Sequence, residues 1–160
     1  MRRLRADRGF TLLELVVVLT VIAILMGVAI PAYFTFLSNT RAAQAVADLQ
    51  AVRAAVYLYY GDSGQWPAES PPGVPPTGIA PNLPKNFIFA NKYYQLDYDN
   101  WVALQTRGRA PNGTDTAIGI SIVSRDPKLL LRIQRLIRGA TFNKISTIKY
   151  TLEIATMKGF

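Results

Sequence analysis

One uninterrupted apolar stretch near the N-terminus constrains this chain more than any other feature. Residues 12–30 read LLELVVVLTVIAILMGVAI, and residues 15–40 contain no Asp, Glu, Lys or Arg. A helix needs about 20 apolar residues to cross a lipid bilayer. Bulky side chains occupy every side of this segment, as expected for a helix surrounded by lipid or by other helices. Four arginines within residues 1–9 predict that the N-terminus stays in the cytoplasm and the rest of the chain lies outside.

Three interpretations of this stretch compete. A secretory signal peptide should end at a small-x-small cleavage site, whereas this stretch runs into Pro31, Tyr33 and Phe34. A plain membrane anchor is the second interpretation, and it gives no reason for Glu14. A carboxylate in a membrane helix is costly and by default marks function, so the third interpretation gives Glu14 a role with a partner.

The string RGFTLLELVVVLTVIAILMGVAIPAY closely resembles the N-terminal signature of the type IV pilin superfamily. That group includes pilus subunits, minor pilins and the pseudopilins of type II secretion. The resemblance covers about residues 1–60. It combines a short basic leader, Gly9 before Phe10, Glu14 five residues into the mature chain, an apolar run, and Pro31 at the expected distance.

The resemblance implies a maturation step and a mode of assembly. A prepilin peptidase would cut between Gly9 and Phe10, remove the leader 1–9, and then N-methylate Phe10. In a filament, Glu14 of one subunit would face the Phe10 amine of a neighbour, because a charge pair is tolerable at low dielectric and an unpaired charge is not. The competing interpretation keeps the Glu14 carboxylate at the level of the lipid headgroups.

Gly27 and Pro31 are expected to shape the helix. Proline cannot donate a backbone hydrogen bond, so Pro31 should bend the helix or leave a melted stretch that lets helices pack in a filament. Gly27 would ease either outcome. The competing interpretation is a simple end to the membrane span, which we place at about residues 12–31.

Past the span, the helix is expected to continue, so that it covers residues 10–60 as a whole. Its outer part has an apolar stripe with spacings of three and four. The stripe consists of Val46, Leu49, Val52, Val56 and Tyr60. Residues 61–160 should form a globular head, and the proline-rich residues 66–84 are expected to be a loop within it. A polyproline ligand for a partner is the alternative for that loop.

The head is predicted to hold an antiparallel sheet. Strand-like runs occupy residues 87–90, 92–98, 101–106 and 117–123, and residues 145–155 should close the sheet. Asp99 and Asn100 are predicted to form a turn between two of these strands. The expected fold class is therefore α+β and pilin-like, with a long N-terminal helix packed on an antiparallel sheet and a short extra helix.

That extra helix is predicted over residues 126–139, with Asp126 as its N-cap, Pro127 in its first turn and Gly139 at its end. Its buried face should comprise Leu129, Leu130, Ile133, Leu136 and Ile137. Its outer face is basic and comprises Arg125, Lys128, Arg132, Arg135 and Arg138. This outer face is either a solvated surface or an anion-binding surface for DNA. Few stacking aromatic residues lie near it, which counts against a dedicated single-strand site.

The composition argues against catalysis. The chain has no Cys and no His, which excludes disulfides, Cys/His zinc sites, cysteine nucleophiles and a Ser-His-Asp triad. No catalytic residues and no cofactor are expected. Asp97, Asp99 and Asn100 suggest a calcium loop, but the other ligands of such a motif are missing, so no metal is predicted.

The sequence as a whole predicts a structural subunit of a type IV pilus-like filament that is not an enzyme. The subunit would start as a single-pass inner-membrane protein and end in a cell-surface pilus or a periplasmic pseudopilus. By resemblance, its partners would be further copies and related pilins, the prepilin peptidase, an inner-membrane platform protein, an assembly ATPase and membrane lipid. A pseudopilin of a type II secretion system is one alternative, and a DNA-binding minor pilin at a filament tip is another.

Overall fold

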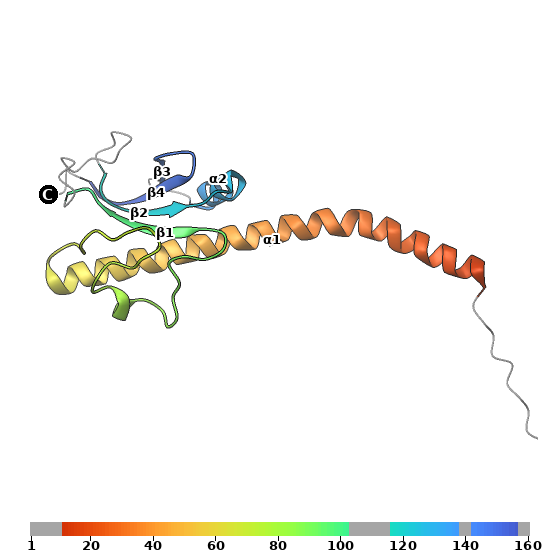
Figure 1. The fold of residues 1–160 in the computed structure, drawn as a ribbon, viewed down its shortest axis with the longest axis horizontal. Coiled ribbons are helices and arrows are strands. Elements are labelled where there is room, and N and C mark those ends of the chain that lie inside the picture. The colour runs from red at the N-terminus through yellow and green to blue at the C-terminus, as the bar shows by residue number, and fades with distance from the viewer. Residues whose placement is uncertain (1–10, 103–115, 138–141, 157–160) are drawn as a thin grey trace, which may run out of the picture. The chain divides into compact units, whose positions relative to one another are not determined.

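The computed structural model describes residues 11–102, 116–137 and 142–156. The chain divides into two compact units, Met1–Ser38 and Asn39–Phe160, which we call the N-terminal unit and the head unit. Figure 1 shows the described helices and strands. In chain order they are α1 (Leu12–Ser63), the 3-10 helix η1 (Ala80–Asn82), β1 (Gln95–Asn100), β2 (Thr116–Val123), α2 (Pro127–Leu136), β3 (Phe142–Lys144) and β4 (Lys149–Thr156). The predicted α+β class is confirmed.

Helix α1 ends three residues later than predicted, at Ser63 rather than at residue 60. The string Gly61-Asp62-Ser63-Gly64 was expected to break the helix, and its first three residues lie inside α1. The actual stop is Gly64, which has a φ of +69° and donates its backbone N–H to the Tyr60 carbonyl at 2.8 Å. A left-handed residue at this position is costly for any side chain with a Cβ, so glycine ends the helix here.

The part of α1 that belongs to the N-terminal unit is apolar and exposed. Its side chains are exposed from Leu12 to Phe36, and α1 is the one helix among the described residues that is long and apolar enough to cross a membrane. Helix α1 is unbroken through Gly27 and Pro31. In the single subunit, Pro31 is therefore helical. The helix is neither melted there nor ended there.

The head unit contains one four-stranded antiparallel sheet with the order β1-β2-β4-β3. Alternation along the strands gives the sheet an apolar face and a polar face. The apolar face is fully buried at Leu96, Tyr98, Ile120, Ile122 and Leu152. It forms one core with the buried stripe of α1 and with α2.

The stripe of α1 in the head unit is close to the predicted one. Leu49, Val52 and Val56 are fully buried, Val46 is half-buried, and Tyr60 is exposed. The remaining positions of the stripe are small, namely Ala42, Ala45 and Ala55, all fully buried. Figure 1 shows β1 alongside this part of α1.

Helix α2 matches its predicted start. The Asp126 carboxylate accepts the backbone N–H of Lys128 at 2.9 Å, and Pro127 is the first helical residue. Leu129, Leu130 and Ile133 are buried as predicted, and so is Ile137 just after the helix.

Two predicted features of this helix differ or cannot be placed. Leu136 is 51% exposed rather than buried, because it lies beside the buried stripe and not within it. The predicted end at Gly139 lies outside the described residues, and α2 ends at Leu136.

Four predictions about the strands of the head differ from the structure. Asp99 and Asn100 are not a turn, since they pair with Gly119 and Ile118 at the end of β1. Residues 87–90 form no strand beyond a single bridge between Ala90 and Gln95. The predicted strand 145–155 begins later than expected, because residues 145–148 form the loop between β3 and β4 and the rest of the segment lies in β4. Of the predicted strand 101–106, Trp101 and Val102 lie in a turn, and residues 103–106 lie outside the described residues.

Candidate functional site

Glu14 lies in the first turn of α1 and is held by its neighbour Thr11. The Glu14 carboxylate accepts the Thr11 backbone N–H at 2.9 Å and the Thr11 hydroxyl at 2.8 Å. In return, the Glu14 backbone N–H donates to the Thr11 hydroxyl at 3.2 Å. This reciprocal pattern is a capping box, which satisfies backbone donors that have no partner at a helix start. The carboxylate is therefore positioned by local geometry and still exposed to a partner.

Hydroxyl groups along the rest of the exposed segment bond to their own helix. Thr20 donates to the Val16 carbonyl at 2.8 Å, and Thr35 donates to the Pro31 carbonyl at 3.0 Å. Polar groups in lipid must be satisfied within the segment, and these bonds to the fourth preceding carbonyl do that. The segment is thus suited to a lipid surrounding or to a surrounding of other helices.

Gly27 has open space around it, because a Cβ added there would meet no atom within 4 Å. Its role, and that of Pro31, is therefore not explained by packing inside one subunit. The predicted cleavage and methylation residues, Gly9 and Phe10, lie outside the described residues, as does Arg138.

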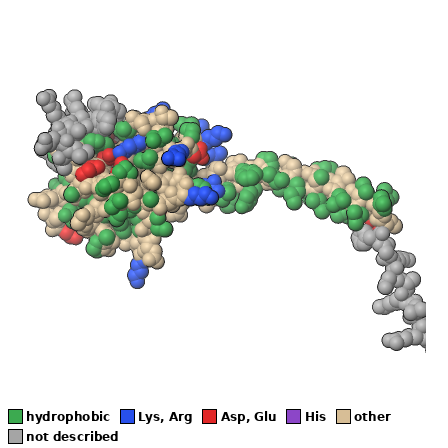
Figure 2. All heavy atoms as spheres, in the orientation of Figure 1, with side chains coloured by type: hydrophobic (Ala, Val, Ile, Leu, Met, Phe, Trp, Pro, Cys, Tyr) green, Lys and Arg blue, Asp and Glu red, His purple; other side chains and the backbone are tan. Residues whose placement is uncertain are grey.

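The predicted basic surface forms around α2, and we call Arg125, Lys128, Arg132 and Arg135 the basic face. Figure 2 shows Lys and Arg side chains gathered at the end of the head unit that carries α2. Three of the four are exposed, and Arg132 is half-buried. The Arg132 guanidinium donates to the side-chain oxygen of Asn39. One residue of the basic face, Arg132, is thus hydrogen-bonded to Asn39, the first residue of the head unit.

A fifth cation, Arg41, lies close to the start of α2. Its guanidinium is stacked over the Tyr93 ring, 4.1 Å from the centroid. The hydroxyl of Ser124 donates to the Tyr93 carbonyl at 2.8 Å, and Ser124 directly precedes Arg125. These contacts connect α1 to the loop that leads into α2.

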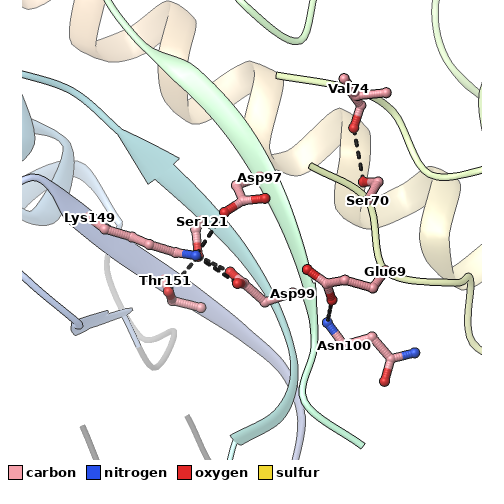
Figure 3. Close-up of polar contacts among 9 residues, drawn as sticks. All are labelled: Glu69, Ser70, Val74, Asp97, Asp99, Asn100, Ser121, Lys149 and Thr151. Atoms are coloured by element: carbon pink, nitrogen blue, oxygen red, sulfur yellow. Dashed lines mark hydrogen bonds and ion pairs between the residues drawn. The ribbon is translucent and has the colours of Figure 1, made fainter. Parts of the chain in front are cut away.

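A buried charge cluster lies on the polar face of the sheet (Figure 3). The Lys149 ammonium donates to Asp97 at 2.7 Å and to Asp99 at 2.6 Å. Ser121 donates to the second oxygen of Asp99, and its hydroxyl lies 2.6 Å from that of Thr151. Three adjacent strands, β1, β2 and β4, are therefore joined through side chains as well as through the backbone.

The loop residue Glu69 adds a third carboxylate to this cluster. Its carboxylate accepts the backbone N–H of Asn100, and one oxygen from each of Glu69, Asp97 and Asp99 lies within 4.8 Å of the others. Such oxygens are the ligands that hard cations prefer. The cation that Asp97 and Asp99 face in the structure is the ammonium of Lys149.

The environment shifts the pKa values of these groups. Burial raises the pKa of Glu69, opposed by its bond from Asn100. Burial also raises the pKa of Asp97, opposed by its bond from Lys149. Burial alone would lower the pKa of Lys149, but its bonds to Asp97 and Asp99 raise it above its ordinary value. The lysine therefore stays charged at neutral pH.

Sequence reasoning missed Glu69 and Lys149 in this cluster. It noticed Asp97 and Asp99, but took Asp99 for a turn residue. The alternation of polar and apolar side chains from residue 95 to residue 99 was the available signal, since it is typical of a strand with one polar face. No local signal points to Glu69 or Lys149, which reach the cluster from distant parts of the chain.

Comparison with known proteins supports the features of the N-terminal segment. The profile of the prokaryotic N-terminal methylation motif matches residues 4–30. A type IV major pilin protein of Neisseria gonorrhoeae is 37% identical over 68 residues, which are 42% of this chain and 32% of that protein. A fimbrial protein of Eikenella corrodens is 36% identical over 66 residues, 41% of this chain and 43% of that protein.

A longer similarity extends past the motif. A fimbrial protein of Dichelobacter nodosus is 35% identical over 114 residues, which are 70% of this chain and 66% of that protein. No solved structure matches the chain at a comparable level of significance. The chain spans less than half the length of the first two relatives.

The methylation motif, the capped apolar helix that carries Glu14, and the similarity to fimbrial proteins together identify the chain as a member of the type IV pilin superfamily.

Proposed function

We propose that this protein is a structural subunit of a type IV pilus-like filament. The observation that carries the proposal is the combination of a methylation motif over residues 4–30 with a long apolar helix whose side chains are exposed in the single subunit. Exposed apolar surface of this extent needs lipid or other helices around it. A membrane holds such a segment before assembly, and neighbouring subunits hold it afterwards.

We propose that maturation follows the scheme of the superfamily. A prepilin peptidase removes the leader 1–9 by cleavage between Gly9 and Phe10, and Phe10 is then N-methylated. The mature chain consists of a long helix that begins near Phe10 and ends at Ser63, followed by the part of the head unit that holds the proline-rich loop 66–84 and the sheet. The subunit is held in the inner membrane with its N-terminus in the cytoplasm and is passed to the filament by a platform protein and an assembly ATPase.

Glu14 is proposed to set the register of assembly. The carboxylate lies at the start of an apolar helix and is kept ordered by Thr11. In a filament it would meet the positive Phe10 amine of a neighbouring subunit, and an unpaired carboxylate in the same apolar place would be expensive. Gly27 and Pro31 are proposed to let the helices adapt to one another, since neither is explained by contacts within one subunit.

Mass and N-terminal mapping of the protein from sheared surface filaments, and separately from membranes, tests this function. Sheared filaments that contain a chain starting at methylated Phe10 support the pilus subunit. A processed chain that stays in the cell envelope supports the alternative, a pseudopilin of a type II secretion system. A chain that begins at Met1 in every fraction contradicts both and leaves a simple membrane-anchored domain.

A further inference from the structure

The side chain of Lys149 is held against two carboxylates within the sheet. Its Nζ atom lies 2.6 Å from Oδ1 of Asp99 and 2.7 Å from Oδ2 of Asp97. The Lys149 side chain is 21% exposed, and those of Asp99 and Asp97 are 7% and 5% exposed. An amine and a carboxyl group that are kept in contact and away from water react as parts of one molecule, which greatly raises the rate at which a bond forms between them.

Lys149 reaches both carboxylates because the strand between them carries small side chains. Asp97 and Asp99 belong to β1, Lys149 belongs to β4, and β2 lies between these two strands. The β2 residue paired with Asp97 is Ser121, and the one paired with Asp99 is Gly119. Figure 3 shows the Lys149 side chain extending past Ser121 to the two carboxylates. The contact therefore joins two strands that are not neighbours in the sheet.

Asp99 has the environment that an attacked carboxyl group needs. Its Oδ2 atom accepts the hydroxyl of Ser121, and the Ser121 hydroxyl lies 2.6 Å from that of Thr151. A hydrogen-bond donor at this oxygen stabilises the negative charge that develops on it when a nitrogen attacks the carboxyl carbon Cγ. Oδ1, on the side of Lys149, is the oxygen that is free to leave.

Asp97 has a different environment, which favours the uptake of a proton. Its Oδ1 atom is buried and has no hydrogen-bond partner among the described residues, and such an oxygen is costly in a charged carboxylate. Burial raises the pKa of Asp97, and the nearby charge of Asp99 raises it further. An oxygen of Glu69 lies within 4.8 Å of oxygens of both, which adds repulsion among the carboxylates. Asp97 is therefore suited to accept a proton from Lys149.

We propose that Lys149 and Asp99 form an intramolecular isopeptide bond, an amide between Nζ and Cγ, with Asp97 as the proton carrier. The Lys149 ammonium has no free electron pair, so it first gives a proton to Oδ2 of Asp97. Nζ then attacks Cγ of Asp99, and a C–N bond replaces the bond from Cγ to Oδ1. Asp97 returns its proton to the departing oxygen, which takes a second proton from the nitrogen and leaves as water. The positive and the negative charge disappear together, and no oxidant or cofactor is needed.

The amide gives the head unit a covalent link between β1 and β4. The chain contains no Cys, so no disulfide does this. The closed loop runs from residue 99 to residue 149 and contains β2, α2 and β3. Such a closure restricts the unfolded chain and thereby favours the folded one. The link lies wholly within the head unit, so it depends neither on the membrane nor on assembly into a filament.

Peptide mapping of the full chain, purified in detergent, tests the bond. The intact mass should be lower, by the mass of one water molecule, than the mass calculated from the mapped N-terminus. Trypsin does not cut after a lysine whose amine is part of an amide, so peptide 93–107 should appear joined to peptide 145–158. A succinimide at an aspartate also loses water, but it leaves peptide 93–107 unlinked. Fragment ions show which aspartate carries the amide.

Three variants separate the roles of the residues. Lys149→Arg keeps the positive charge but replaces the amine with a guanidinium that stays protonated, so the linked peptide should disappear. Lys92→Arg makes the same exchange at an exposed residue outside the cluster and should leave the amount of linked peptide unchanged. Asp97→Asn preserves the size of the side chain but removes the proton carrier, so the linked peptide should be lost there too. Fluorescence of Trp66 and Trp101 confirms that each variant is folded.

The possible results separate an isopeptide bond from an ordinary ion pair. A folded wild-type chain that has its full calculated mass and is cut by trypsin after Lys149 overturns the proposal. An amide on Asp97 instead of Asp99 overturns the roles assigned to the two carboxyl groups. A linked peptide that persists at the wild-type amount in Asp97→Asn shows that Asp97 is not the proton carrier. The proposed filament function is unaffected by any of these results.

Discussion

The two parts of α1 make a useful comparison, because one continuous helix meets two different surroundings. In the N-terminal unit its large apolar side chains are exposed, as at Leu25, which is 64% exposed. In the head unit the helix buries a narrow stripe that contains Leu49, which is fully buried. The first part is apolar on all sides and needs partners outside the subunit, whereas the second finds its partners within the subunit. Helix formation is thus common to both, and the distribution of apolar residues decides where the burial takes place.

The largest effect is expected from Glu14→Ala. If the N-terminal part acts only between subunits, this change should abolish incorporation into filaments, because the Phe10 amine of the neighbour loses its partner in an apolar surrounding. Cleavage of the leader should continue, and the stability of the head should not change. Immunoblots of sheared filaments and of membranes measure incorporation and processing. Normal incorporation of the variant would remove Glu14 from the assembly model.

Lys149→Met is expected to be the most destabilising change in the head. It leaves Asp97 and Asp99 buried without their cation, and loss of one partner of a buried ion pair costs about 3 kcal/mol or more. Urea unfolding of the full chain in detergent, followed by fluorescence of Trp66 and Trp101, measures the free energy of unfolding. Both tryptophans lie in the head unit, so the signal does not report on the apolar segment.

Two further observations complete this test. The loss should shrink as the pH falls, because burial raises the pKa of Asp97 and a protonated carboxyl group no longer needs a cation. Lys92→Met removes an exposed charge and should change the stability by about 0.5 kcal/mol or less. Equal effects of the two lysine variants would mean that the cluster contributes nothing to the fold.

Leu49→Ala and Leu25→Ala compare the two parts of α1 directly. Leu49→Ala leaves a cavity in the core and should lower the free energy of unfolding of the head by about 3 kcal/mol. Leu25→Ala removes the same atoms from an exposed position and should leave that free energy unchanged. The same urea experiment measures both. A loss of head stability in Leu25→Ala would contradict the separation of the two parts.

The smallest effect concerns Asp97 and the pH. The pKa values of Asp97 and Glu69 are raised in the folded protein from ordinary values of 3.8 and 4.5. A raised pKa means that the folded state binds the proton more tightly, so these two groups should increase stability as the pH falls from neutral to about 4.5. Asp97→Asn should flatten this rise, because the amide cannot take up a proton in this range. Unfolding curves at several pH values would detect it, and an unchanged pH profile would show that Asp97 does not titrate in that range.

Local signals predicted some elements of the head well and others poorly. The start of α2 was correct because Asp126 and Pro127 act on their own next turn. The end of α1 was misplaced because Gly61 and Gly64 are equally plausible in the sequence, and the chain uses the left-handed conformation only at Gly64. Asp99 was taken for a turn residue because Asp and Asn favour turns. In the structure its carboxylate instead accepts hydrogen bonds from Lys149, fifty residues away, and from Ser121.

The sequence by itself determined the character of the N-terminal segment, residues 1–40. An apolar run free of charge, a carboxylate at its start and a basic leader act through local properties that need no tertiary contact to be recognised. Only the tertiary structure decided which distant residues meet in the head unit. The cluster of Glu69, Asp97, Asp99 and Lys149, and the attachment of α2 to Asn39, join residues far apart in the chain. Such contacts depend on strand register and on packing, and the propensities of neighbouring residues do not encode them.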